Sequence, residues 1–456
     1  MKQHWVRDAV FYHIYPLAFC DAPQRNDFHS AAIPRLDKIR DWIGHLLDLR
    51  VNALYLGPIF ESTAHGYDTA DYFWVDRRLG TNETIRQLVQ ELHRNGIKIV
   101  LDGVFNHVGR DFWAFRDVLQ NRENSPYRNW FKGLNFGGRS PYGDPFTYES
   151  WSGNYDLVKL NLAEPAVKEH LLLAVRQWIV DFEIDGFRLD VADTLDLQFQ
   201  RELGAFCRKL RPDFWLMGEV IHGDYRNWAN LETLDSVTNY EVYKGLYSSL
   251  ADKNYFEIAY ALNRQFGADG MYRDLPLYNF VDNHDVNRVA SNLQNPAHLY
   301  PLYALLFTIP GVPSIYYGSE WGLKGKRTAT NDRPLRPSLD LETIRQKAPQ
   351  PELEKTIGRL AQIRRGSAAL KVGDYAQLFV SHEQFAFSRK TDDDQVLVLL
   401  NAADAPSAFE LPVSLGDGTR LVDLLNSGES FRVTGGSLRV ESVPPHWARI
   451  LHIERG

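Results

Sequence analysis

An α/β fold is predicted for this chain of 456 residues: a (β/α)₈ TIM barrel with a small excursion domain after strand 3 and a C-terminal antiparallel β-sandwich. Three observations favour this fold. Short apolar runs alternate eight times with helical stretches, one interval of that alternation is too long for a single helix, and short alternating runs take over after residue 371. A chain of this length with 44% hydrophobic residues can bury a large core and favours two or three domains.

Eight apolar, β-branched or aromatic runs are the candidate barrel strands. Several are apolar throughout, as expected for parallel strands that are covered on both faces. The segments between them, for example Glu83–Asn95 and Pro165–Phe182, show helical periodicity. The eight runs are Val10–Tyr15, Ala53–Phe60, Ile97–Phe105, Gly186–Val191, Trp215–Val220, Ser236–Tyr240, Leu277–Val281 and Pro313–Tyr317. Alternation of strand and helix repeated eight times predicts the barrel.

The same pattern divides the chain into three domains. Residues 1–106 and 164–371 are assigned to the barrel, and residues 107–163, rich in Gly, Pro and aromatic residues, to the excursion domain. Residues 372–456 are assigned to the β-sandwich, because short alternating runs are separated there by Asp, Gly, Ser and Pro clusters. The runs are Tyr375–Val380, Gln395–Asn401, Gly418–Leu425, Ser437–Val443 and Ala448–Ile453. The charged, Pro-rich segment 324–350 is expected to form a loop at the barrel mouth.

Charge and composition exclude several classes of partner. The net charge of −7 and the lack of a long Lys/Arg run argue against nucleic acid and anionic membranes. The polar start, Met1–Asp8, and the short apolar run after it do not match a signal peptide, and no run reaches the length of a membrane span. Cys20 and Cys207 lack metal-type spacing and are expected to be reduced thiols, which favours a cytoplasmic protein.

Polar residues gather at the ends of four of the predicted strands, which is where a barrel of this kind builds its active site. Arg188 and Asp190 share the inward face of one strand, so the guanidinium is expected to keep Asp190 ionised as a nucleophile. Glu219 ends the next strand among other carboxylates, whose field raises its pKa toward that of a general acid. The four strand ends are Asp102–His107, Gly186–Asp190, Gly218–Val220 and Asp282–Asp285.

A pair of carboxyl groups with these two roles predicts hydrolysis of a glycosidic bond with retention of configuration. Asp285, next to His284, is a third acid that can stabilise an oxocarbenium-like transition state or fix sugar hydroxyls. An alternative is a metal-assisted hydrolase that uses Asp102, His107, Asp190, His284 and Asp285 as ligands. The absence of a His-x-His or other closely spaced ligand pair argues against it, so no metal ligand is assigned.

These four strand ends resemble the ordered signature segments of the α-amylase family, glycoside hydrolase family 13. Gly57–Phe60, His65–Thr69 and Gly311–Glu320 resemble that family too. The resemblance implies that Asp190 is the nucleophile, Glu219 the acid/base and Asp285 the transition-state stabiliser. It also implies that the sugar in the cleavage subsite is contacted by Tyr67, Asp68, His107, Arg188 and His284. Asp102 is expected to orient its neighbours from below.

Leu157–Asn161 and Glu219–His222 resemble the intracellular neopullulanase and cyclomaltodextrinase members of the family. The implied substrate is an α-glucan, a maltooligosaccharide or a cyclodextrin, with mainly α-1,4 bonds cleaved. A 4-α-glucanotransferase-like transglycosylase or an α-glucosidase of the same family remains an alternative, and so does a non-catalytic member. No cofactor is required; Asn106 matches a ligand of a structural calcium, but Asp193 and Thr194 replace the usual Lys-His pair. The oligomeric state is left open.

Overall fold

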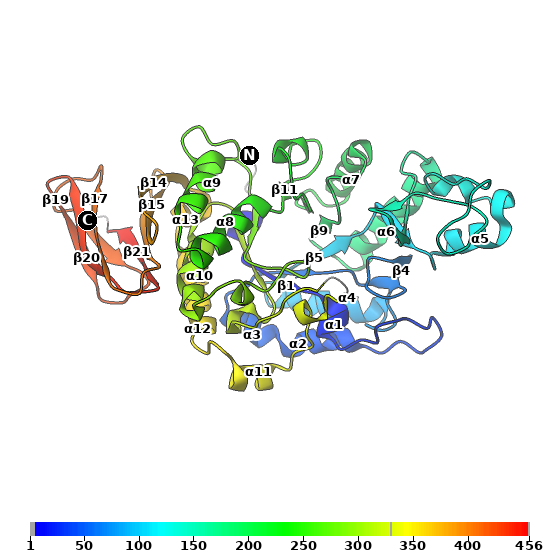
Figure 1. Cartoon of the computed structure of the whole chain (residues 1–456), viewed down its shortest axis with the longest axis horizontal. Helices are drawn as coiled ribbons and strands as arrows, with labels where there is room; N and C mark the ends of the chain where they lie inside the picture. Colours follow the sequence, from blue (N-terminus) through cyan, green and yellow to red (C-terminus); the bar gives the residue numbers. More distant parts are fainter. Residues whose placement is uncertain (1–4, 329–330, 455–456) are drawn as a thin grey trace.

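The structure is a computed structural model in which residues 5–328 and 331–454 are described. Three parts follow one another along its long axis (Figure 1). The C-terminal strands form one end, the barrel lies in the middle, and the segment around α5 (Trp113–Asn121) projects at the other end. The first and last few residues of the predicted domains, 1–4 and 455–456, lie outside the described residues, as do residues 329–330 of the predicted mouth loop.

The barrel is a parallel sheet of eight strands, in agreement with the predicted fold. Neighbours in the sheet follow chain order, β13 pairs with β1, and a parallel bridge between Thr238 and Tyr278 closes the gap between β11 and β12. The strands are β1 (Phe11–Ile14), β2 (Ala53–Leu56), β5 (Lys98–Gly103), β9 (Gly186–Leu189), β10 (Trp215–Gly218), β11 (Ser236–Val237), β12 (Tyr278–Phe280) and β13 (Val312–Tyr316).

Two predicted strands differ from the observed ones. The run Ala53–Phe60 ends its barrel strand at Leu56, and after Gly57 and Pro58 the chain leaves the sheet and continues into a hairpin. That hairpin consists of β3 (Phe60–Ser62) and β4 (Thr69–Val75). The run Ser236–Tyr240 keeps only two residues in the sheet, because the Asn239 side chain accepts from Val242 N and starts a helix at Tyr240.

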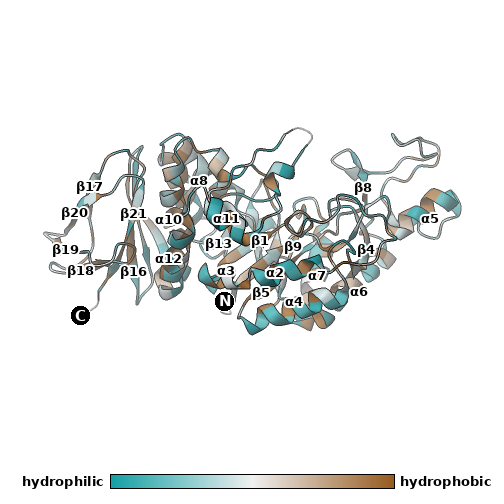
Figure 2. Cartoon of the chain, turned by 90° about the horizontal axis from the view of Figure 1, so that it is seen from below, coloured by the Kyte–Doolittle hydropathy of each residue, from teal (hydrophilic) through white to brown (hydrophobic). Residues whose placement is uncertain are grey.

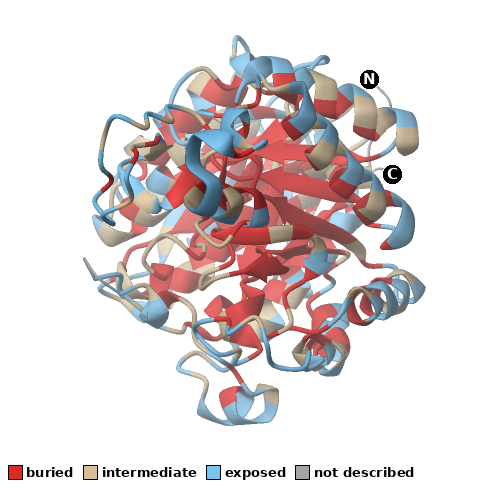
Figure 3. Cartoon of the chain, turned by 90° about the vertical axis from the view of Figure 1, so that its right-hand side faces the viewer, coloured by how far each residue is buried: buried red, intermediate tan, exposed pale blue. Residues whose placement is uncertain are grey.

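Helices surround the barrel and bury one face against it. α4 begins at a capping box between Thr81 and Thr84, and its apolar face packs on the strands while its outer face is polar (Figure 2). Figure 3 shows the buried strands inside a ring of helices with exposed outer faces. The helices are α1 (Pro16–Phe19), α2 (Lys38–Asp41), α3 (Ile43–Asp48), α4 (Asn82–Arg94), α6 (Pro165–Asp181), α7 (Leu197–Leu210), α8 (Tyr240–Ala251), α9 (Phe256–Phe266), α10 (Leu299–Thr308), α11 (Leu341–Lys347), α12 (Leu353–Gly366) and α13 (Ala368–Val372).

Aromatic side chains fill the barrel interior at the amino-terminal ends of the strands. Phe11 lies 5.1 Å from Trp215 and 5.4 Å from Tyr278, measured between ring centroids. Trp5, from a 3-10 helix before β1, packs 6.1 Å from both Phe11 and Trp215. Because this end of the barrel is packed with aromatic residues, the polar residues of the interior are confined to the opposite, carboxyl end of the strands.

The segment after β5 carries a small antiparallel sheet of its own. It consists of β6 (His107–Gly109), β7 (Ser150–Trp151) and β8 (Asn154–Lys159), in the order β6-β8-β7. Its aromatic residues divide between core and surface: Trp130, Phe131, Phe146 and Tyr148 are buried, whereas Trp113 and Tyr142 are exposed. Phe112 and Phe115 are buried as well, so six rings form this small core, while Trp113 and Tyr142 remain available to solvent.

The C-terminal part is an eight-stranded antiparallel arrangement that packs against α10 and α13. Its strand order is β14-β15-β16-β21-β18-β19-β20-β17. Three of its strands, β15, β17 and β19, are absent from the sequence prediction. The strands are β14 (Asp374–Val380), β15 (Gln384–Lys390), β16 (Gln395–Asn401), β17 (Ser407–Pro412), β18 (Arg420–Asp423), β19 (Ser430–Thr434), β20 (Ser437–Val443) and β21 (Trp447–Ile453).

Cys20 and Cys207 are both buried, and each is a free thiol in the structure. Within the described residues, none of the helices combines the length and the apolar character that crossing a membrane requires.

Candidate active site

Asp190 and Glu219 sit directly beyond two neighbouring barrel strands. The Asp190 N–H donates to the Gly103 carbonyl at 3.1 Å and the Glu219 N–H to the Leu189 carbonyl at 2.9 Å, so the parallel hydrogen-bond ladder extends to both residues. Phe187 and Leu189 of β9 pack outward in the core, which turns Arg188 and Asp190 inward. The fold therefore fixes both carboxyl groups on rigid elements at the barrel mouth, where they are only 6% and 8% exposed.

Arg188 joins three carboxyl groups. Its Nη1 lies 2.9 Å from Asp190 Oδ1 and 2.9 Å from Asp102 Oδ1, and its Nη2 lies 2.9 Å from Glu219 Oε1. The other oxygen of Glu219 accepts from the Val191 N–H at 3.0 Å. The guanidinium thus holds the two candidate catalytic groups at fixed positions relative to each other.

Asp102 lies beneath this pair and is saturated by donors. Besides Arg188, it accepts from the Tyr55 hydroxyl at 2.9 Å and the Tyr67 hydroxyl at 3.1 Å. Asp102 is almost fully buried and has no open side for a ligand. These contacts agree with the expectation that Asp102 orients its neighbours.

Burial works against the expected effect of Arg188 on the ionisation of Asp190. Burial raises the pKa of Asp190 well above its usual range, and Arg188 opposes this effect without overcoming it. Burial also raises the pKa of Glu219, with Arg188 again opposing and Asp285 adding to the rise. The physical reason is that one guanidinium is divided among three carboxyl groups in a site that excludes water. The two groups therefore form a coupled pair that tends to retain a proton.

The pKa of Asp285 is shifted in the opposite direction. Burial raises its pKa, but His284 and Arg336 outweigh burial and bring the pKa far below the usual range. His284 Nε2 lies 3.0 Å from Asp285 Oδ2, and Arg336 Nη2 lies 2.9 Å from Asp285 Oδ1. The pKa of Asp285 is therefore lowered, whereas burial raises the pKa values of Asp190 and Glu219 beside it.

Tyr67 and His284 form an aromatic wall of the site. Their rings are nearly parallel, at 9° and 5.6 Å between centroids, and the Tyr67 hydroxyl lies 2.5 Å from His284 Nε2. Tyr15 stacks on His284 at 5.8 Å and 10°. Tyr67 stays partly exposed, so the wall keeps an apolar surface against which a ring can pack.

Asp68 and His107 complete the predicted set. Asp68 Oδ1 accepts from the N–H groups of His65 and Gly66, both at 3.1 Å, and so shapes the turn that presents Tyr67. His107 Nε2 lies 3.7 Å from Asp190 Oδ2, and burial lowers the pKa of His107 to about 3, which keeps the ring neutral. Since His107 Nε2 has no hydrogen-bond partner in the described part of the chain, it is available to a ligand.

Arg336 and Tyr15 are site residues that the sequence reasoning missed. Arg336 comes from the segment 324–350, which was expected at the barrel mouth, and its Nε donates to the His284 carbonyl at 2.9 Å. Its guanidinium lies 4.5 Å from the centre of the Tyr15 ring. A hollow of about 480 Å³ opens beside both residues, with His65 and Asp332 in its lining. The high charge of segment 324–350 was the one feature of the sequence that could have indicated Arg336 as a site residue.

Tyr240, at the start of α8, and Asn283, shortly after β12, are two more site residues whose roles the sequence reasoning missed. Asn283 Oδ1 accepts from the Asp285 N–H at 2.8 Å, and Asn283 Nδ2 donates to the Tyr240 hydroxyl at 3.2 Å. Asn283 belongs to the predicted strand end Asp282–Asp285, but its role as the cap of the Asp285 turn is a backbone interaction that the residue pattern did not indicate.

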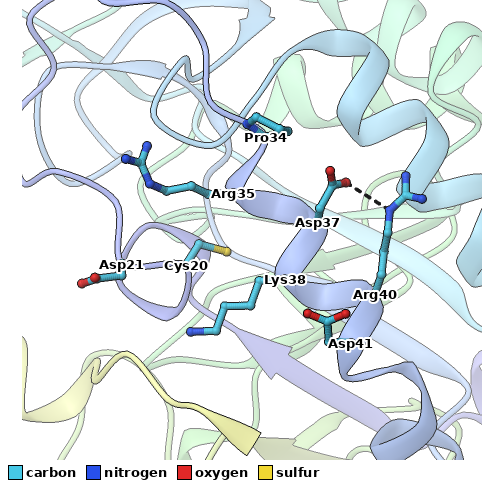
Figure 4. Close-up of a pocket in the computed structure, with 8 residues that line it drawn as sticks. All are labelled: Cys20, Asp21, Pro34, Arg35, Asp37, Lys38, Arg40 and Asp41. Carbon is cyan, nitrogen blue, oxygen red and sulfur yellow. Dashed lines mark ion pairs between the residues drawn. The ribbon is translucent and has the colours of Figure 1, made fainter.

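A further hollow, of about 630 Å³, lies outside this cluster (Figure 4). Lys38 extends beside Cys20, whereas Arg40 is directed toward Asp37, with which it pairs at 3.1 Å. Burial raises the pKa of the Cys20 thiol to about 12, so it is not a nucleophile at neutral pH. Across the described residues, no group of three or more His, Cys, Asp or Glu side chains has an arrangement that could hold a metal ion.

Comparison with known proteins agrees with this geometry. Residues 13–357 match the family described as "Alpha amylase, catalytic domain", and residues 375–450 match "Maltogenic Amylase, C-terminal domain". A cyclomaltodextrinase from Bacillus sp is 34% identical over 418 residues, which cover 87% of this chain and 73% of that protein. Neopullulanase 2 from Thermoactinomyces vulgaris is 34% identical over 471 residues, covering 98% and 78%.

Among solved structures, one similar chain matches over nearly its whole length. The ligand-free cyclic α-maltosyl-(1→6)-maltose hydrolase from Arthrobacter globiformis superposes with a TM-score of 0.82 at 28% identity, covering 99% of this chain and 100% of that chain. The barrel, the small sheet after β5 and the C-terminal strands are therefore shared with that solved structure as one unit.

Proposed function

We infer from the site that this chain, which belongs to the α-amylase family, is a retaining glycoside hydrolase that cleaves α-glucosidic bonds, mainly α-1,4, in maltooligosaccharides, cyclodextrins or related α-glucans. The observation that carries the proposal is the pair Asp190 and Glu219, fixed by one guanidinium on neighbouring strand ends. The names of the similar proteins, cyclomaltodextrinase and neopullulanase, support the substrate class.

In the first step, the Asp190 carboxylate attacks the anomeric carbon while Glu219 gives its proton to the glycosidic oxygen. The C–O bond to the leaving sugar breaks, and a covalent glycosyl ester forms on Asp190. The raised pKa of Glu219 keeps the required proton on that side chain, and substrate binding decides how the one proton of the pair is placed.

In the second step, Glu219, now ionised, takes a proton from water, whose oxygen attacks the anomeric carbon and frees Asp190. Two inversions give net retention. Asp285, kept ionised by His284 and Arg336, stabilises the positive charge that develops at the anomeric carbon in both steps. Tyr67 packs against the sugar ring, and His107, Arg188, His284 and Asp68 contact or orient its hydroxyl groups.

The protein carries out these steps with its own carboxyl groups, and we propose that neither a cofactor nor a metal is required for them. Treatment with a chelator should leave the rate unchanged. A loss of the rate that added calcium restores would refute the proposal that no metal is required.

The cysteine content supports a cytoplasmic location, because both thiols are buried and free.

The experiment that tests the proposal is a time course of products from maltotriose, γ-cyclodextrin, pullulan, starch and sucrose. We expect the cyclodextrin to be opened to short maltooligosaccharides. NMR should detect the α-anomer as the first product. Release of the β-anomer would refute retention. Products longer than the maltotriose supplied would make the enzyme a transferase.

A further inference from the structure

Another hollow in the surface, beside the β3–β4 hairpin, carries the features of a carbohydrate site. It has a volume of about 470 Å³. Trp74 of β4 lines it and is 62% exposed, although an indole is among the largest apolar side chains. We propose that this hollow, the Trp74 hollow, binds a segment of α-glucan chain at a distance from the catalytic pair. This inference rests on the proposed function for its choice of ligand.

The polar residues of the Trp74 hollow have hydrogen-bonding capacity to spare. Arg77 is held in place by Glu61, through Arg77 Nε to Glu61 Oε1 at 2.6 Å and Arg77 N to Glu61 Oε2 at 2.8 Å. Neither Nη atom of Arg77 is hydrogen-bonded within the described chain, so both can donate to a ligand. Asp71 Oδ1 accepts from the Phe73 N–H at 2.8 Å, and its other oxygen can accept.

An exposed ring between a fixed donor and a free acceptor matches the chemistry of a glucose unit. The C–H face of the sugar packs on the aromatic face, while its hydroxyl groups both donate and accept. The charges exclude an anionic ligand, because Glu61, Asp71 and Asp111 line the hollow against the single guanidinium of Arg77. A neutral polyhydroxylated chain can use the Trp74 ring, the Nη groups of Arg77 and the free oxygen of Asp71 together.

The position of the hollow connects it to the proposed substrate. Asp111, which accepts from the Thr63 hydroxyl at 3.0 Å, lines both the Trp74 hollow and a neighbouring hollow of about 530 Å³. That neighbour reaches His65 and Asp68, the turn that presents Tyr67 to the catalytic site. A glucan held at Trp74 is thus held on the rim that leads to the active site, which favours long chains over short ones.

The test measures binding separately from turnover. Native electrophoresis through gels that contain increasing glycogen is run on D190N, which blocks the chemistry, and on D190N combined with W74A, W74Y or Y260A. Acarbose is added throughout to occupy the active site. Tyr260 is the matched control, because it is an aromatic residue 70% exposed on α9, at a distance from β4 (Figure 1).

We expect W74A to raise the apparent dissociation constant about two- to tenfold, since an aromatic contact contributes on that scale. W74Y should keep most of the retardation, and Y260A should migrate like D190N alone. In the enzyme with Asp190 intact, W74A should lower kcat/KM on starch and leave kcat/KM on maltotriose within twofold. Equal retardation of W74A and Y260A, or no retardation of D190N itself, would overturn the proposal.

Two further readings separate the possible failures. If W74A shifts the chain from dimer to monomer in size-exclusion chromatography, the hollow is an interface between copies and the proposal is wrong. If the parent hydrolyses none of the glucans, the proposed function fails, whereas the glycogen gel still reports on the Trp74 hollow. Circular dichroism of W74A and W74Y confirms that each variant is folded.

Discussion

Arg336 donates to Asp285 through Nη2 at 2.9 Å, although the two residues are 51 positions apart and belong to different loops. The Arg336 side chain is largely buried, and its guanidinium also rests on the Tyr15 ring at 4.5 Å. The contact combines a charge-assisted hydrogen bond with an aromatic platform, and so fixes both the charge and the orientation of Asp285.

Replacing Arg336 by Ala should therefore impair catalysis more than folding. We expect kcat to fall about 100-fold, because one oriented charge interaction in a dry site contributes on that scale. R336K should recover only part of the loss, since Lys cannot donate and stack in the same geometry. K326A, an exposed cation in the same segment, is the control. Equal rates for R336A and K326A would contradict a role for Arg336.

The two catalytic roles can be distinguished by chemical rescue. E219Q should lower kcat at least about 100-fold on natural glucans. Azide should rescue this variant on an activated glucosyl donor with retention, because the covalent intermediate on Asp190 still forms. D190A rescued by azide should instead give the inverted product, since azide then attacks directly. If the two variants gave azides of the same configuration, our assignment of roles would be wrong.

The strand ends of the barrel could be predicted because each is a local pattern. Arg188 and Asp190 are two residues apart on an apolar strand, so their shared inward direction follows from the period of a strand. Arg336 could not be placed in the same way, because its partner lies on another loop and only the folded chain brings them together. The sharing of Arg188 among Asp102, Asp190 and Glu219 could not be predicted either, because a neighbour in sequence does not reveal how many carboxyl groups contact one guanidinium.

The C-terminal strands illustrate another limit. β15 contains Arg389, which is fully buried because it donates to the carbonyls of Thr308 at 2.7 Å and Leu370 at 3.1 Å across the junction with the barrel. A charged residue in that position interrupts the apolar pattern, so the sequence does not indicate a buried strand there. β17 buries only two side chains and β19 only one, so each strand offers too few apolar positions for its alternation to stand out.

The raised pKa values of Asp190 and Glu219 predict the pH dependence of catalysis. Turnover requires one proton on the pair, so kcat/KM should fall on the acid side as a second proton binds and on the alkaline side as the last one leaves. Because burial raises both pKa values, both limbs should lie above the range of about 4 that is usual for free carboxyl groups.

A pH profile of kcat/KM on maltotriose measures this directly. R188M should move the acid limb to higher pH, because Arg188 opposes the rise in both pKa values. The position of the limb, rather than the rate, is the readout, since Arg188 also holds the site together. An acid limb that stays in place in R188M would show that the guanidinium does not control this pair.

Tyr67 offers a test of the aromatic wall. Y67F keeps the ring beside His284 but removes the hydroxyl contacts with Asp102 and His284. Y67A removes the ring as well as the hydroxyl group. We expect Y67F to lower kcat/KM several-fold and Y67A to lower it further, by about another tenfold, because the packing surface for the sugar is lost. Similar losses for the two variants would mean that the ring does not contact the sugar.

His45 predicts how stability depends on pH, away from the active site. His45 Nε2 lies 2.8 Å from Glu320 Oε1 and Nδ1 lies 3.0 Å from Glu354 Oε1. Burial alone would lower the pKa of His45, but the hydrogen bonds and charges of these two residues outweigh burial and raise it. A group whose pKa is raised on folding stabilises the protein fully below its unfolded pKa of about 6.5, and this stabilisation is lost as the pH rises through the folded value.

The melting temperature should therefore decline as the pH increases from about 6.5 upward, and H45Q should show a flatter profile. H45Q should also be less stable at pH 6, by about 3 kcal/mol, because it leaves Glu320 buried without its charged partner. H29Q, at an exposed position, serves as the matched control. If H45Q and the parent lost stability in parallel over this pH range, the imidazolium between Glu320 and Glu354 would not be the source of the dependence.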